Sequence, residues 1–191
     1  MTGGLHPRTP FVLPSHFSSL TSYFSRMIPT DGRILGVDWG ELRIGLALSD
    51  ESQVLATPLE TLLRREGKRF PMPRFLQLIA LHNPVGLVVG LPLSLEGTEG
   101  DSAIAAREVA ASVTRRTGLP LEMWDERMST ARALAAIREQ GGSTRGRKAD
   151  VDSLAAAVLL QHFLDARRNR AERADEAEGA EEKDQTLRPE R

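Results

Sequence analysis

The run Val85–Leu91 (VGLVVGL) constrains the fold more than any other part of the sequence. A continuous apolar run of this length suits a strand that is buried on both faces of a sheet. Asn83-Pro84 before it and Pro92 after it mark its ends, because proline interrupts regular structure. A strand buried in this way needs helices packed over the sheet. The chain is therefore expected to be an α/β protein.

Shorter β-type segments surround this central run. Arg33–Trp39 and Arg43–Leu48 are separated by a short glycine-containing turn, which predicts a hairpin. Val54–Leu59 predicts a weaker third strand, and Leu121–Trp124 predicts a short final one. Hairpin strands followed by alternating strands and helices indicate a mixed sheet. The predicted fold is a mixed five-stranded sheet flanked by helices.

Helices are predicted where apolar residues recur at helical spacing. The expected segments are 70–81, about 98–117, about 130–140 and from about 150 onward. Thr98 or Asp101 is the expected N-cap of the second helix, and Asp150 is the expected N-cap of the last one.

Both ends of the chain differ in composition from its middle. Residues 1–30 contain no acid and are predicted to be a disordered extension or a misassigned start, since Met27 lies just before the first ordered segment. Residues 167–191 are rich in mixed charge and poor in bulky apolar side chains, which predicts a disordered tail whose first part extends the preceding helix. The folded domain is predicted to cover 31–166.

The composition excludes several classes of protein. The chain has no cysteine, so it has neither a disulfide framework nor a thiolate metal site. It also has no apolar run near the roughly 20 residues that a membrane-spanning helix needs. The formal net charge is -1, so a nucleic-acid partner would need a local basic patch. The absence of cysteine fits a reducing cytoplasm, and no contact with a membrane is expected.

One acidic residue, Asp38, stands in an otherwise apolar strand, between Gly36 and Gly40. A buried carboxylate is costly unless it is paired with a cation or bound to a metal. Glycines beside it allow a ligand to approach closely. An ion pair with Arg43 across the hairpin is the simpler explanation. We favour a metal ligand, because surface ion pairs are rarely set between buried strand residues.

Two further acidic segments are candidates for the same site. Asp125 and Glu126 end a strand, where α/β sheets place their ligand sites, and because neighbouring side chains on a strand point in opposite directions, only one of them should face the site. Asp150 and Asp152 open the last helix, where an acid also suits the helix dipole. Helix geometry alone allows either aspartate to be the ligand.

Hydroxyl and basic residues near these acids predict a substrate-binding surface for a polyanion. A loop at the carboxyl end of one strand carries two hydroxyl groups, and a basic loop precedes the last helix. Two further arginines flank the acids and could contact a phosphate. The predicted substrate-binding residues are Arg43, Ser94, Thr98, Arg127, Arg145, Arg147 and Lys148.

Carboxylates from separate strands and a helix are chemically reasonable as a set. Two Mg²⁺ or Mn²⁺ ions about 4 Å apart share oxygen ligands, activate water and stabilise the leaving oxygen in phosphodiester cleavage. Hard oxygen ligands without cysteine favour these ions over Zn²⁺. The pattern therefore predicts a metal-dependent nuclease.

Four segments, in order, resemble the YqgF/RuvX family of pre-16S rRNA nucleases, also described as Holliday-junction-resolvase-like. The segments are ILGVDWGELRIGLALSD, VVGLPLSLEGTEG, WDERMSTARA and KADVDSLAAAVLL, within roughly Arg33 to Leu164. The resemblance implies an RNase H-like fold, a cytoplasmic location, and phosphodiester hydrolysis at the 5′ end of pre-16S rRNA in ribosome biogenesis. It also implies that the catalytic and metal-binding acids are Asp38, Glu126 and Asp152.

Some positions depart from the family pattern. Glu41-Leu42 stands where Thr-Lys is common, and Ser94 stands where Asn is usual, which bears on substrate affinity. An ATP-handling actin-like domain would also carry Gly-x-Asp-x-Gly, but such proteins are much longer. A non-catalytic assembly factor that binds rRNA or ribosomal particles is a second alternative. A DNA junction resolvase is a third; it would need a dimer, whereas a monomer is expected here.

Overall fold

The computed structural model describes residues 27–64, 70–94, 97–125 and 148–186, with side chains in the last stretch described for 151–177. The predicted helix at about 130–140 therefore lies outside the described residues. The elements in chain order are β1 (Ile34–Trp39), β2 (Arg43–Ser49), β3 (Ala56–Leu63), α1 (Met72–His82), β4 (Gly86–Leu91), α2 (Asp101–Thr117), β5 (Leu121–Asp125) and α4 (Lys148–Thr186).

The strands form one mixed sheet in the order β3-β2-β1-β4-β5. β1, β2 and β3 are joined by antiparallel pairing, whereas β4 runs parallel to β1 and β5 runs parallel to β4. The predicted mixed five-stranded sheet flanked by helices is confirmed, and so is the β1–β2 hairpin. The carboxyl ends of β1, β4 and β5 consequently lie at the same edge of the sheet.

The third strand was expected at 54–59 but occupies 56–63. The backbone N–H groups of Val54 and Leu55 donate to a carboxylate oxygen of Asp50, at 2.8 and 2.9 Å. These N–H groups therefore belong to a turn and cannot form the hydrogen bonds that pair β3 with β2. At the other end, Glu60 to Leu63 also pair with β2, which lengthens the strand.

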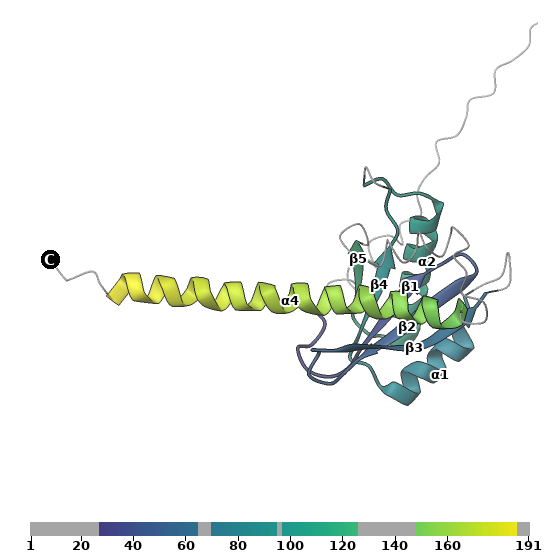
Figure 1. Cartoon of the computed structure of the whole chain (residues 1–191), viewed down its shortest axis with the longest axis horizontal. Coiled ribbons are helices and arrows are strands. Elements are labelled where there is room, and N and C mark those ends of the chain that lie inside the picture. The colour runs from purple at the N-terminus through teal and green to yellow at the C-terminus, as the bar shows by residue number, and fades with distance from the viewer. Residues whose placement is uncertain (1–26, 65–69, 95–96, 126–147, 187–191) are drawn as a thin grey trace, which may run out of the picture.

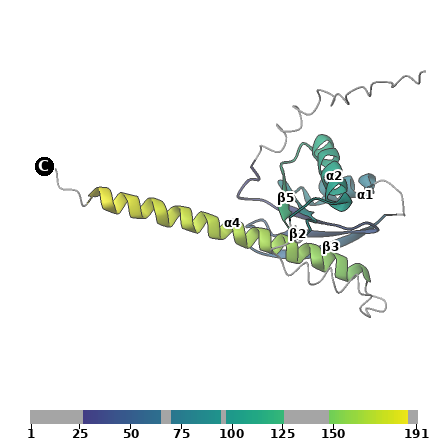
Figure 2. The same cartoon turned by 90° about the horizontal axis from the view of Figure 1, so that it is seen from above.

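Helices cover both faces of the sheet. α1 and α2 lie on one face and α4 lies on the other, as the view from above shows (Figure 1, Figure 2). Side chains of β1 alternate between the two layers: Leu35, Val37 and Trp39 join the core under α1 and α2, whereas Ile34 joins the core under α4. Val88 of β4, from the sequence's longest apolar strand, also lies under α4 and is fully buried.

The observed ends of the helices agree only in part with those predicted from the sequence. Asn83 ends α1 in a left-handed conformation (φ 46) with its N–H bonded to the carbonyl of Ile79, as a stop at this position predicts. The predicted caps are wrong for α2, because its N-cap is Gly100 and no side chain caps it. α4 begins at Lys148, so Asp150 lies inside its first turn and not at the cap.

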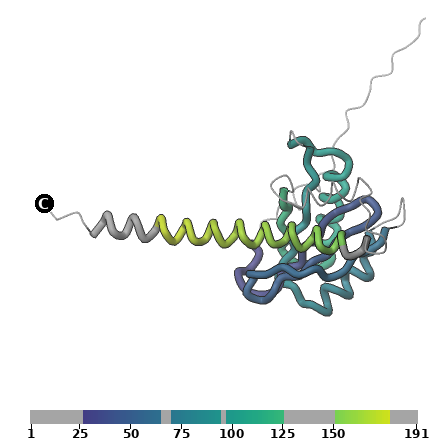
Figure 3. Tube along the Cα trace, viewed as in Figure 1, coloured from purple at the N-terminus to yellow at the C-terminus, as the bar shows by residue number. Residues whose placement is uncertain are grey.

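α4 is 39 residues long and crosses the sheet before extending past it (Figure 1, Figure 3). The first part of the charged tail from 167 was expected to extend this helix, and the helix continues to Thr186. Arg167 anchors α4 to the segment before β1 and to the turn after β2. Its guanidinium donates to Gln53 Oε1 at 3.0 Å and to the backbone carbonyl of Ile28, and the Ile28 side chain is buried. A helix anchored in this way elongates at little further cost. No helix in the described ranges is both long and apolar enough to cross a membrane.

Candidate active site

Asp38 lies near the carboxyl end of the central strand and is 6% exposed. It occupies the same side of β1 as Gly36, whose Cβ position would lie 2.9 Å from Leu160 of α4. The carboxylate of Asp38 therefore belongs to the α4 face of the sheet, where its strand neighbour across the hairpin is Gly45.

Gly45 brings the last helix onto this point of the sheet. A Cβ atom at Gly45 would lie 1.9 Å from the carbonyl oxygen of Asp152, so only glycine leaves room for the helix backbone. Asp152 is fully buried there. Two acids far apart in sequence are thus placed beside the same residue of β2. The sequence quoted Gly45 within a motif but did not assign it this role; an isolated glycine inside a strand was the available clue.

Arg43 lies next to the same pair of acids. Its Nη1 atom is 3.7 Å from Oδ2 of Asp152, whose side chain is 1% exposed, and Arg43 itself is about one-third exposed. The simpler explanation for Asp38 was an ion pair with Arg43; the structure gives Arg43 an ion pair with Asp152. A predicted phosphate contact therefore also neutralises a predicted metal ligand.

Replacing Arg43 with Met should lower the free energy of unfolding of the metal-free protein by about 1–2 kcal/mol, because Asp152 would keep its burial and lose a cation. The matched control is Arg33→Met, which breaks an exposed ion pair with Glu51 at 3.4 Å and should cost less than about 0.5 kcal/mol. Urea unfolding in EDTA measures both. Equal losses in the two variants would show that the Asp152 carboxylate does not depend on Arg43.

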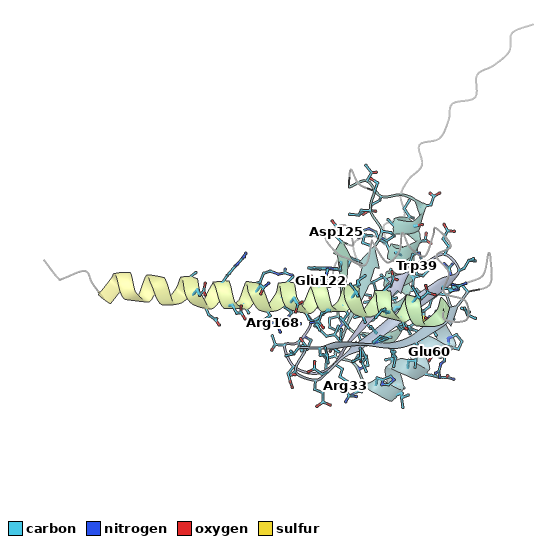
Figure 4. The ribbon with its side chains drawn as sticks, in the orientation of Figure 1. Arg33, Trp39, Glu60, Glu122, Asp125 and Arg168 are labelled. Atoms are coloured by element: carbon cyan, nitrogen blue, oxygen red, sulfur yellow. The ribbon has the colours of Figure 1, made fainter. Side chains whose placement is uncertain are left out.

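The third predicted acid, Glu126, follows the last residue of β5 and lies outside the described residues. Trp124 packs edge-on against Phe163 of α4 at 5.3 Å, so its position faces α4. Asp125 occupies the alternate position at the end of β5 (Figure 4). Among the residues with described side chains, no three or more His, Cys, Asp or Glu form a metal-binding group.

Basic residues predicted around the acids are mostly not described. Arg127, Arg145 and Arg147 lie outside the described ranges, and Lys148 lies in the first turn of α4 with no described side chain. Of the predicted basic contacts, the structure thus places only Arg43 beside the acids within the described residues.

The loop after β4 is held by its own hydroxyl groups. Ser94 Oγ and Thr98 Oγ1 lie 2.7 Å apart, and the N–H of Thr98 donates to Ser94 Oγ at 3.1 Å. Next to it, the Arg107 guanidinium hydrogen-bonds Glu99 and holds the pKa of that carboxyl below its usual value. Both hydroxyl groups therefore shape the loop, at the sheet edge where β1 also ends.

The donor chemistry at the centre of the site fits a hard divalent cation. Asp38 and Asp152 are buried carboxylates on one face of the sheet, at the edge where β1, β4 and β5 end. Oxygen ligands of this kind suit Mg²⁺ or Mn²⁺.

A family model described as "RuvX: Holliday junction resolvase" matches residues 32–166. The chain belongs to the RuvX family. The family predicted from the sequence segments is therefore confirmed.

Several relatives of this RuvX protein carry the description "Putative pre-16S rRNA nuclease". One from Gluconacetobacter diazotrophicus is 45% identical over 138 residues, which is 71% of this chain and 88% of the relative. One from Anaeromyxobacter sp. (strain Fw109-5) is 43% identical over 135 residues, covering 71% and 98% of the two chains. One from Mycobacterium sp. (strain KMS) is 40% identical over 141 residues, covering 73% and 83%.

Among solved structures, "T. thermophilus RuvC in complex with Holliday junction substrate" matches with a TM-score of 0.46 and 19% identity. The match covers 72% of this chain and 96% of that one.

Proposed function

We propose that this RuvX protein is a metal-dependent nuclease that hydrolyses phosphodiester bonds in the 5′ region of pre-16S rRNA. The observation that carries the proposal is the placement of Asp38 and Asp152, both buried, next to Gly45 on the α4 face of the sheet. Family membership supports a nuclease, and the names of the relatives support the RNA substrate.

Asp38, Glu126 and Asp152 are the residues that would hold the metal. Glu126 stands two positions after Trp124, which is the spacing of side chains on one face of a strand. A bound divalent ion supplies a nucleophilic water at neutral pH and stabilises the leaving oxygen. The burial of Asp38 and Asp152 supports this chemistry, because electrostatic interactions strengthen where water is excluded.

Arg43 has a positioning role in this proposal. Its contact with Asp152 fixes the carboxylate while the exposed part of the guanidinium faces incoming phosphate. The basic loop that holds Arg145, Arg147 and Lys148, together with Arg127, would add sequence-independent attraction for the polyanion. We further propose that the protein works in the cytoplasm as a monomer on ribosomal precursor particles.

The family description favours a second substrate, a four-way DNA junction. The deciding experiment offers purified protein three substrates: a 5′-extended 16S rRNA precursor, a single-stranded DNA of the same sequence, and a four-way DNA junction. Each is incubated with Mg²⁺, with Mn²⁺ and with EDTA. An Asp152→Asn preparation purified in the same way controls for contaminating nuclease.

Removing the metal should abolish cleavage, because the acids alone supply no activated water. The expected result is cutting of the RNA precursor with Mn²⁺ or Mg²⁺, none in EDTA, and restoration when the metal is added back. Cutting of the junction alone would replace the RNA proposal with the resolvase. Cutting that survives EDTA, or no cutting of any substrate by folded protein, would overturn the metal-dependent nuclease.

A further inference from the structure

A second cavity lies on the opposite face of the sheet from the acids. Its volume is about 330 Å³, and it runs between α2 and the start of α1. Its apolar floor comes from Trp39, Phe70 and Met72, and its α2 wall includes Ser112 and Arg116. Cavities that hold small organic ligands begin at about 300 Å³. The proposed acids do not use this cavity.

Aromatic and cationic groups are stacked along one end of the cavity. The rings of Trp39 and Phe70 lie 6.3 Å apart at 17°, and the guanidinium carbon of Arg64 lies 4.4 Å from the Trp39 ring centroid. Phe70 in turn meets Phe75 edge-on at 5.1 Å. Trp39 is 6% exposed and so supplies a buried floor, whereas Phe70 and Arg64 are partly exposed beside the cavity. Stacked aromatic rings and guanidinium planes are the surfaces on which single-stranded bases are bound.

The charges of the cavity suit a phosphate with a base attached. The cavity is lined by two cations, Arg64 and Arg116, and by one acid, Glu108. Glu108 is exposed at the rim of the cavity. An arginine can bind a phosphate through two hydrogen bonds. A carboxylate at the rim can accept a hydrogen bond from the exocyclic amino group of a base. An apolar floor, two arginines and one acceptor together match the parts of a nucleotide.

The cavity is also in the right place to receive part of the nuclease substrate. Trp39 directly follows Asp38, and the two side chains lie on opposite faces of β1 at its carboxyl end. A strand that passes over this end of β1 would present one phosphodiester to Asp38 and a neighbouring nucleotide to the cavity. We propose that the α1–α2 cavity is a subsite that binds one flanking nucleotide of a single-stranded RNA substrate.

This inference rests on the proposed nuclease function for its substrate, so its test is made without cleavage. A fluorescently labelled single-stranded RNA of about ten nucleotides is titrated in EDTA, and binding is followed by anisotropy at several salt concentrations. The test variant is Arg116→Ala. The control is Arg115→Ala, because Arg115 is equally exposed in the same last turn of α2 but does not line the cavity.

Arg116→Ala should weaken RNA binding five- to tenfold and lower the salt slope by about one, as expected for one lost phosphate contact. Arg115→Ala should stay within twofold of the wild type. Filling the cavity with Ser112→Phe should weaken binding at least as much as Arg116→Ala. A matching single-stranded DNA shows whether the subsite distinguishes the sugar. Equal effects of the two arginine variants, or no effect of Arg116→Ala and Ser112→Phe, would overturn the subsite.

Binding and cleavage then report on different proposals. If wild-type protein fails to cut RNA with metal but Arg116→Ala still weakens binding selectively, the subsite stands and the nuclease proposal fails. If cleavage is metal-dependent but the variants bind normally, the subsite fails alone. In a cleaving enzyme, Arg116→Ala should raise KM with kcat nearly unchanged, because the lost contact is made equally before and during the reaction.

Discussion

Replacing Gly45 with Ala should destabilise this protein more than the same change at Gly36 or Gly86 of the sheet. The new Cβ atom would lie 1.9 Å from the carbonyl oxygen and 2.6 Å from the carbonyl carbon of Asp152. If the clashing group were a side chain it could rotate away, but the atoms that meet the new Cβ belong to the backbone of α4. Relief therefore requires α4 to move off β2. We expect a loss of about 3 kcal/mol or more in the free energy of unfolding, at or beyond the upper end for overpacked cores.

The same change should remove most of the activity in the protein that remains folded. A shift of α4 by about 1 Å moves Asp152 relative to Asp38, and misplacements of that size can cost about 100-fold in rate. Urea unfolding and precursor cleavage measure the two effects.

Two other glycines give a graded comparison. At Gly36 a Cβ atom would meet the Leu160 side chain at 2.9 Å, and at Gly100 it would meet nothing within 4 Å. The expected order of destabilisation is Gly45, then Gly36, then Gly100. A Gly45→Ala variant as stable as Gly100→Ala would show that α4 does not rest on β2 as described.

The sheet could be predicted from the sequence because its strands carry local patterns. Val85–Leu91 is apolar throughout, and β4 occupies nearly all of it. The β1–β2 hairpin is bounded by turn residues, and its register follows from them. β3 was displaced because its start depends on hydrogen bonds from Asp50, which replace the ladder for two residues. The pattern of apolar residues alone does not predict that a side chain will take the backbone hydrogen bonds that a strand would otherwise use.

The candidate site could be predicted only in its residue types. Asp38 was evident as an acid within a buried strand, but the burial of Asp152 depends on the position of α4. The contact between Gly45 and Asp152 joins two segments that share no local pattern. An extension of α4 into the charged tail was expected, but its length was not, since the hydrogen bonds of Arg167 to Gln53 and Ile28 are tertiary contacts.

Replacing Asp38 with Asn should lower the rate of cleavage by about 1,000-fold or more while the fold is retained. Asparagine has nearly the same shape, so the packing beside Gly45 is kept, whereas a neutral amide binds Mg²⁺ or Mn²⁺ much less strongly than a carboxylate. Precursor cleavage at saturating Mn²⁺ measures the rate. The control is Asp31→Asn, an exposed acid upstream of β1, which should cleave at the wild-type rate.

Stability provides a second and independent readout of Asp38→Asn. Asparagine keeps the shape of the buried side chain, so the melting temperature of Asp38→Asn in EDTA should stay within a few degrees of that of the wild type. A ligand that binds only the folded state raises the melting temperature, and this increase should appear with Mn²⁺ in the wild type and in Asp31→Asn but be largely lost in Asp38→Asn. If Asp38→Asn instead melts well below the wild type in EDTA and keeps its response to Mn²⁺, Asp38 has a structural role and the metal is held elsewhere.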